Sequence, residues 1–124
     1  MDRKELQKRT QKFHVEVIHL CTGFPKNAAG FETVRQLIRA AGSVGSNYRA
    51  TARAKSDADF IHKIEIVLEE ADESHYWLEI VKEAMLRTGE GVDWLIDEAN
   101  QLTAIFAAAD KTAKANKRKN IGFK

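Results

Sequence analysis

The stretch from Ser56 to Met85 reads SDADFIHKIEIVLEEADESHYWLEIVKEAM, and it decides the fold. Its apolar and small residues recur every three or four positions, which predicts one long amphipathic helix. Ser56 and the aspartates after it suit a helix start, because they satisfy free amides and face the positive end of the helix dipole. We expect this helix to end before Gly89-Glu90-Gly91. Its core-facing seam is Phe60, Ile64, Val67, Ala71, Ser74, Leu78, Val81 and Met85.

The same helical period continues on both sides of this segment. A first helix is expected over residues 2–21, ended by Gly23 and Pro25. Its core-facing seam is Leu6, Thr10, Phe13, Val17 and Leu20, and Ile18 and Cys21 lie beside the seam and widen the apolar face. A fourth helix is expected over residues 92–115, with a buried stripe of Leu95, Leu102, Ile105 or Phe106, and Ala109.

A second helix is expected over residues 33–54, where Thr33 and Gln36 have the spacing of a capping box. Gly42 and Gly45 lie inside it, and a glycine costs roughly 1 kcal/mol in a helix interior. The two glycines therefore indicate either the close approach of a neighbouring helix or a kink near Gly45.

Four amphipathic helices with short connections predict an all-α protein, an antiparallel up-down-up-down four-helix bundle. We expect the bundle to occupy residues 1–115 and a basic, mobile tail to occupy residues 116–124. No apolar run is long enough to cross a bilayer and the charged N-terminus lacks a signal core, so we expect a cytoplasmic protein with no membrane partner. The single cysteine, Cys21, suits a reducing compartment and a place in the core.

The net charge of +2 hides an uneven distribution. Residues 111–124 carry six bases and no acid, whereas residues 1–110 carry 14 bases against 18 acids. On the second predicted helix, Arg35, Arg39, Arg49 and Arg53 share a stripe with Gly42 and Ser46. Arginine pairs with phosphate, and small residues let a backbone approach, so these arginines with Lys117, Arg118 and Lys119 are candidate contacts for RNA or DNA. The alternative is a solvated face, or one paired with acids of another subunit.

The third predicted helix carries an acidic stripe of Glu65, Glu69, Asp72, Glu79 and Glu83, with Tyr76 in the gap. The helical wheel places Trp77 and Ile80 opposite the core seam. Tyr76, Trp77 and Ile80 are therefore candidates for an oligomer interface. Packing of Trp77 against the first helix or the tail is the alternative.

The motifs that carry chemistry are missing from the sequence. It has no catalytic triad, no phosphate-binding loop and no Cys-x-x-Cys pair, so we expect no enzyme, no catalytic residues and no cofactor. His75 lies near Asp72 and Glu79, but a di-iron bundle needs a second Glu-x-x-His on another helix, and none exists. We therefore expect His75 to be a histidine at the edge of the core rather than a metal ligand.

Residues 36–50, QLIRAAGSVGSNYRA, resemble the hallmark stretch of a bacterial four-helix-bundle family. The family includes the large-subunit rRNA intervening-sequence proteins and the accessory variability proteins of diversity-generating retroelements. The segments FIHKI at 60–64 and EEADESHYWLE at 69–79, and the Phe24-Pro25 turn, are similar to it too. The resemblance covers roughly residues 6–108. Many members have Ile-Ala-Glu-Gly after the asparagine, whereas this chain has Tyr48-Arg49-Ala50-Thr51, so a role of that glutamate is not carried over.

The resemblance implies a bundle that assembles into homopentameric rings. In the retroelement members it implies a basic ring that binds nucleic acid and associates with a reverse transcriptase. The candidate partners are therefore a second copy of the chain, RNA or DNA, and a reverse transcriptase or another protein. The expected function is a non-enzymatic nucleic-acid-binding or ribonucleoprotein accessory, and the alternative is a protein–protein scaffold without nucleic-acid contact.

Overall fold

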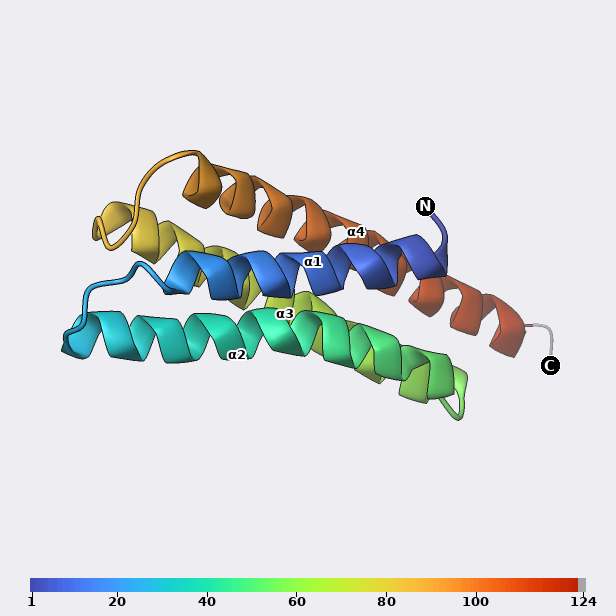
Figure 1. Ribbon diagram of the computed structural model, residues 1–124. Coiled ribbons are helices and arrows are strands. Elements are labelled where there is room, and N and C mark those ends of the chain that lie inside the picture. Colours follow the sequence, from blue (N-terminus) through green and yellow to red (C-terminus); the bar gives the residue numbers. More distant parts are fainter. Residues whose placement is uncertain (123–124) are drawn as a thin grey trace.

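The computed structural model describes residues 1–122, with side chains to residue 120, and it is a bundle of four helices (Figure 1). The described chain contains α1 (Arg3–Cys21), α2 (Ala28–Ala50), α3 (Asp57–Glu83) and α4 (Glu90–Gly122). A short 3-10 turn, η1 (Thr51–Arg53), connects α2 to the loop before α3. The predicted all-α fold and its four helices are confirmed.

Three side chains cap the starts of the helices. The side chains of Asp2, Asn27 and Ser56 accept hydrogen bonds from the backbone amides three residues ahead, which satisfies donors that the first helical turn leaves free. The predicted start at Ser56 is correct. The predicted start of the second helix at Thr33 is wrong, because Asn27 caps α2 six residues earlier and Thr33 is buried inside it.

Successive helices run antiparallel, and each packs against its neighbours in the chain. α1 contacts α2 and α4, and α3 contacts the same two helices, so α1 and α3 occupy diagonally opposite corners. Cross-helix contacts fix the register: Lys82 reaches Asp93 at one end of the α3–α4 pair, and Lys114 reaches Glu65 at the other. One end of the bundle therefore holds the start of α1, the α2–α3 connection and the end of α4 (Figure 1).

The core consists of the predicted seams with a few exchanges. All five predicted seam residues of α1 are buried, and so is Cys21. Of the two residues predicted as alternatives for the core of α4, Phe106 is buried and Ile105 is only partly buried. Ile18 was expected in the core, but it is 39% exposed. Met85 was expected to end the α3 seam, but it is 77% exposed because α3 already ends at Glu83 and Met85 adopts a left-handed φ of 57°.

α4 is longer than the sequence pattern predicted. The helix was expected to end near Ala115, whereas it continues to Gly122. Lysine, arginine and alanine are good helix formers, and no glycine or proline interrupts the segment before Gly122. The expected helix end near Ala115 is therefore wrong, because residues 116–122 of the expected basic tail are helical, while residues 123–124 lie outside the described part of the chain. No helix within residues 1–122 is long and apolar enough to cross a membrane.

Candidate nucleic-acid interface

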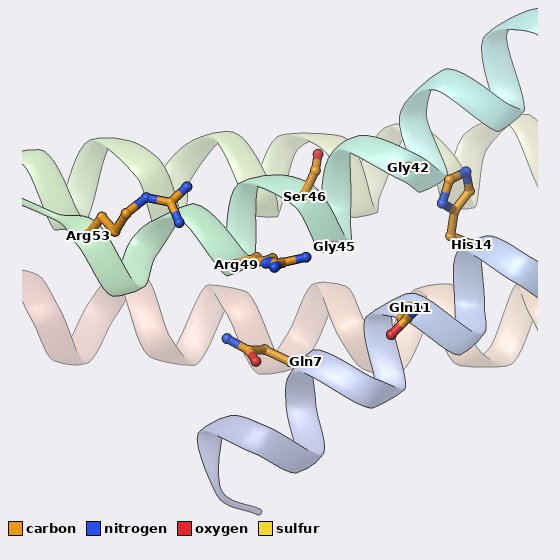
Figure 2. A pocket seen from close by; sticks show the side chains of 8 residues that line it. All are labelled: Gln7, Gln11, His14, Gly42, Gly45, Ser46, Arg49 and Arg53. Carbon is orange, nitrogen blue, oxygen red and sulfur yellow. The ribbon is translucent and has the colours of Figure 1, made fainter.

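A groove of about 440 Å³ runs between α1 and α2, and two glycines make its floor (Figure 2). A Cβ atom on Gly42 would lie 3.0 Å from the His14 imidazole, and one on Gly45 would lie 3.4 Å from the Thr10 hydroxyl oxygen. α2 stays helical through both positions, so the helix does not break there, and the missing side chain of Gly42 lets His14 of α1 approach closely. The residues that line the groove are Gln7, Gln11, His14, Gly42, Gly45, Ser46, Arg49 and Arg53.

The polar groups of the groove suit an anion. Its lining contains side-chain amides, a hydroxyl, an imidazole and two guanidinium groups, but no carboxylate. Arg49 and Arg53 are both exposed, and neither forms an ion pair with any carboxylate of the described side chains. Guanidinium, amide and hydroxyl donors are the groups with which proteins hold phosphate oxygens.

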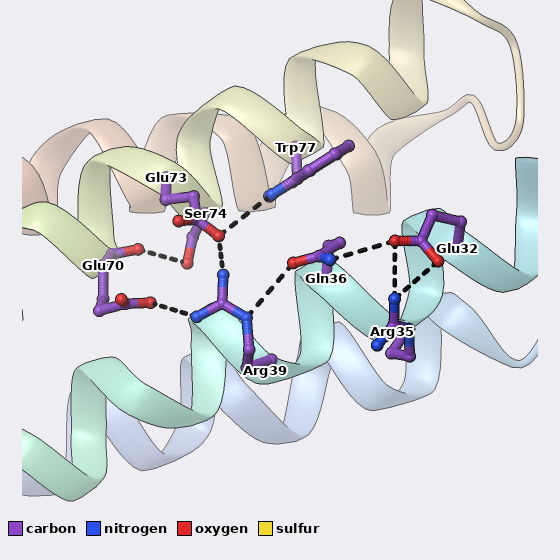
Figure 3. A network of polar contacts seen from close by, with 8 residues as sticks. All are labelled: Glu32, Arg35, Gln36, Arg39, Glu70, Glu73, Ser74 and Trp77. Atoms are coloured by element: carbon purple, nitrogen blue, oxygen red, sulfur yellow. Dashed lines mark hydrogen bonds and ion pairs between the residues drawn. The ribbon is translucent and has the colours of Figure 1, made fainter.

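The other two arginines of the predicted stripe are occupied (Figure 3). Arg39 donates to Glu70 on α3, with 3.1 Å between Nη1 and Oε2, and also to Glu73. Arg35 contacts Glu32 on its own helix at 2.9 Å. The structure thus divides the stripe into a neutralised half and an open half. The acids that neutralise Arg39 belong to its own chain and are not those of the predicted acidic stripe.

The carboxylates around this network differ in their surroundings. Hydrogen bonds from Gln36 and Arg35 hold the pKa of Glu32 below its ordinary value. In contrast, burial raises the pKa of Glu70, and this effect outweighs the opposing charge of Arg39. The charge of Arg39 therefore offsets only part of the effect of burial on the pKa of Glu70.

The predicted C-terminal cations lie at the same end of the bundle as Arg49 and Arg53 (Figure 1). Lys117, Arg118 and Lys119 form no ion pair within the described side chains. Lys114, one turn earlier, is paired with Asp110 at 3.0 Å and Glu65 at 3.5 Å. The hydrogen bond from Lys114 to Asp110 raises the pKa of this lysine. The antiparallel fold, rather than sequence proximity, gathers these cations.

The predicted interface residues occupy different environments on α3. Tyr76 is 55% exposed and lies edge-on to the Trp77 ring. Trp77 is not opposite the seam as predicted, because it is half-buried against the core and its Nε1 donates to Glu73 at 3.2 Å. Ile80 is also half-buried. Tyr76 is therefore the most accessible of the three.

Two further predictions concern reactive groups. Cys21 is buried, and this burial raises the pKa of its thiol to about 11, which makes the thiol a poor nucleophile. His75 lies 3.2 Å from Glu79, and the described side chains contain no group of three or more His, Cys, Asp or Glu residues that would hold a metal.

Sequence reasoning missed two features that the tertiary structure creates. The α1 wall of the groove, formed by Gln7, Gln11 and His14, has a helical spacing of four and three residues that could have revealed one polar face. Glu98 is buried, and both its oxygens accept hydrogen bonds from Arg9 on α1, at 2.8 and 2.7 Å. Nothing in the local pattern of either residue indicated this pair.

Comparisons with known proteins agree with the fold. The family described as 23S rRNA-intervening sequence protein matches residues 3–108. A solved structure of a Bacteroides thetaiotaomicron protein, described as of unknown function and from the S23 ribosomal protein family, is similar with a TM-score of 0.80 and 27% identity. The similarity covers 90% of this chain and 99% of that one. No match was found among curated proteins.

Proposed function

We propose that this chain, which belongs to the 23S rRNA-intervening sequence protein family, is a non-enzymatic, homo-oligomeric bundle that binds nucleic acid as a ribonucleoprotein accessory. The observation that carries this proposal is the open half of the α2 stripe. Arg49 and Arg53 are exposed and unpaired among the described side chains, beside a glycine floor and a carboxylate-free wall. An anion that approaches this groove meets donors and no repelling charge.

The ligand class follows from the donors that the groove holds. Arg49 lies in the last turn of α2 and Arg53 in η1, and both line the same groove, so both guanidinium groups can contact phosphates of one strand. Phosphate contacts position a strand without reading its bases, so binding should tolerate many sequences. Lys117, Arg118 and Lys119 add charge at the same end of the bundle.

The number of contacts argues for several copies. One chain offers two groove arginines and a short cationic helix end, and the residues up to 110 carry a net negative charge. Several linked copies on one strand would raise a weak single-site affinity through avidity. The family resemblance implies five copies. A reverse transcriptase or another protein remains a candidate partner.

The test compares the two halves of the stripe. A fluorescent single-stranded RNA of about 20 nucleotides is titrated with the wild type, with the double variant Arg49→Gln/Arg53→Gln and with the matched control Arg35→Gln/Arg39→Gln. We expect the first variant to lose at least about tenfold in affinity and the control less than about threefold. Raising salt from about 50 to 200 mM should weaken wild-type binding about sevenfold per subunit, if two phosphates are contacted.

The competing function is a protein scaffold without nucleic-acid contact. It is favoured by the exposed acidic face of α3, which would repel a nucleic acid. The same titration with duplex DNA and duplex RNA separates the two functions. If no probe shows a salt-dependent shift, or if the control variant loses as much as the groove variant, the proposed groove is wrong.

A further inference from the structure

The outward ridge of α1 carries three lysines followed by two apolar residues. Lys4, Lys8 and Lys12 are exposed at intervals of four residues, and Val15 and Ile18 are each 39% exposed. None of the three lysines forms an ion pair within the described side chains. We call these five residues the α1 ridge. It is a row of lysines without carboxylate partners, of which Lys12 lies over the Trp94 ring of α4 at 5.4 Å, and it ends in a small apolar patch.

The outward ridge of α3 has the opposite charge and a similar order. Glu65, Glu69 and Asp72 precede Tyr76, which is 55% exposed, and the half-buried Ile80. Glu65 contacts Lys114 at 3.5 Å, while Glu69 and Asp72 have no ion pair within the described side chains. These five residues form the α3 ridge, which is a row of carboxylates that ends in an aromatic and an aliphatic side chain.

The two ridges cannot meet within one chain. α1 and α3 share neighbours, but no Cα atom of α1 lies within 8 Å of one of α3, so their outward faces point away from opposite corners of the bundle. Two different copies of the chain can bring the ridges together. Such a head-to-tail contact uses unlike surfaces and closes into a ring when the rotation between copies permits it.

The spacing of the ridges selects one orientation. At 1.5 Å per residue, Lys4 and Lys12 are about 12 Å apart along α1, and Glu65 and Asp72 are about 10 Å apart along α3. When the helices lie parallel with the apolar ends together, the three lysines lie level with the three carboxylates. In the antiparallel orientation Lys4 and Lys8 extend past Glu83, where α3 ends.

We propose that the α1 ridge of one copy docks in parallel on the α3 ridge of the next copy. This inference rests on the self-association in the proposed function and names its surfaces. Because α1 and α3 run in the same direction within the bundle, parallel docking keeps all copies the same way up. Every copy then presents Arg49 and Arg53 toward the same end of the assembly, as the avidity argument requires.

Charge reversal tests the docking. Lys8→Glu/Lys12→Glu and Glu69→Lys/Asp72→Lys each place like charges opposite one another, so we expect each pair to reduce the assembly to a 14.0 kDa monomer. A chain with all four substitutions restores opposite charges at every contact and should reassemble. The matched control is Lys26→Glu/Lys55→Glu, two exposed lysines in the α1–α2 and α2–α3 connections and outside both ridges, which should leave the oligomer intact. Light scattering measures the mass at about 10 µM, and circular dichroism confirms that each variant is folded.

Each other outcome overturns the proposal in a distinguishable way. A wild type that is monomeric removes the self-association itself. A wild-type oligomer that survives both reversals keeps the proposed function but rejects these surfaces. A four-substitution chain that stays monomeric shows that the ridges do not face each other. If Lys8→Glu/Lys12→Glu leaves the oligomer intact and weakens RNA binding instead, the α1 ridge belongs to the nucleic-acid surface.

Discussion

The two halves of the arginine stripe on α2 and η1 differ although they share a residue type and adjoin in the chain. Arg39 is bound to two carboxylates of α3 and Arg35 to one on its own helix, whereas Arg49 and Arg53 line an open groove. The difference comes from the carboxylates within reach: Glu70 and Glu73 of α3 at the level of Arg39, Glu32 of α2 beside Arg35, and only uncharged groups in the groove beside Arg49. The role of an arginine therefore depends on its neighbours in space as well as on its own helix.

This comparison predicts a series of arginine variants. The more deeply the carboxylate partner is buried, the more the free energy of unfolding should fall when the arginine is replaced. The deepest member is Arg9, whose side chain is 24% exposed and whose partner Glu98 is 9% exposed. Arg9→Ala leaves that carboxylate buried and unpaired, so we expect the free energy of unfolding to fall by about 3 kcal/mol. Urea denaturation followed by circular dichroism measures the loss. Arg9→Ala/Glu98→Ala should recover part of it, and a single-variant loss under about 1 kcal/mol would contradict the series.

Arg39 comes next, because its side chain is 46% exposed and Glu70 is only partly accessible. We expect Arg39→Ala to lower the free energy of unfolding by about 1 kcal/mol, the upper end for an ion pair at a surface. The matched control is Arg49→Ala, which lies on the same helix without a partner and should change the value by less than about 0.5 kcal/mol. Equal losses in the two variants would mean that the pairing with α3 contributes nothing to stability.

Arg35 should have a smaller effect on stability. Its side chain is 73% exposed, and its pair with Glu32 joins neighbouring turns of one helix. Such a pair contributes about 0.3 kcal/mol and weakens as salt is added. We therefore expect a small drop in melting temperature for Arg35→Ala at low salt and no measurable drop at about 1 M salt. A loss that survives high salt would indicate that Arg35 packs against the core.

The smallest expected effect is the dependence of the melting temperature on pH through Glu70. Burial raises the pKa of Glu70 in the folded state above its ordinary value of 4.5. The stability that protonation of Glu70 contributes is therefore fully present below that value and is lost as pH rises through the raised pKa. Glu70→Gln cannot titrate, so its melting temperature relative to the wild type should rise by less than about 2 °C between pH 4 and pH 7. If the melting temperature of Glu70→Gln relative to the wild type falls instead as pH rises, the charge of Arg39 outweighs the effect of burial on the pKa of Glu70.

Most of the fold could be predicted because the apolar period is strong in every helix. Leu6, Phe13, Val17 and Leu20 were assigned to the core from their spacing and are buried. Two errors fall at helix ends, where single side chains decide: Asn27 is the cap of α2, and Met85 has a left-handed conformation. The face predicted for Trp77 inside α3 is also wrong, because the ring packs against the core. Of the candidate site, the sequence identified Arg49 and Arg53 but could not separate them from Arg35 and Arg39.

The sequence by itself determined the four helices and most of the composition of the core, because these follow from periods of 3.5 residues. That α1 is the helix which approaches the glycines of α2 came from the tertiary structure. The tertiary structure alone decided which charges are free. Glu70 and Glu73 neutralise Arg39 across 31 and 34 residues of chain, and Glu98 holds Arg9 across 89. A helical period fixes the face on which a residue lies, but it does not fix the height of the next helix, and ion pairing depends on both because charges must meet within about 4 Å.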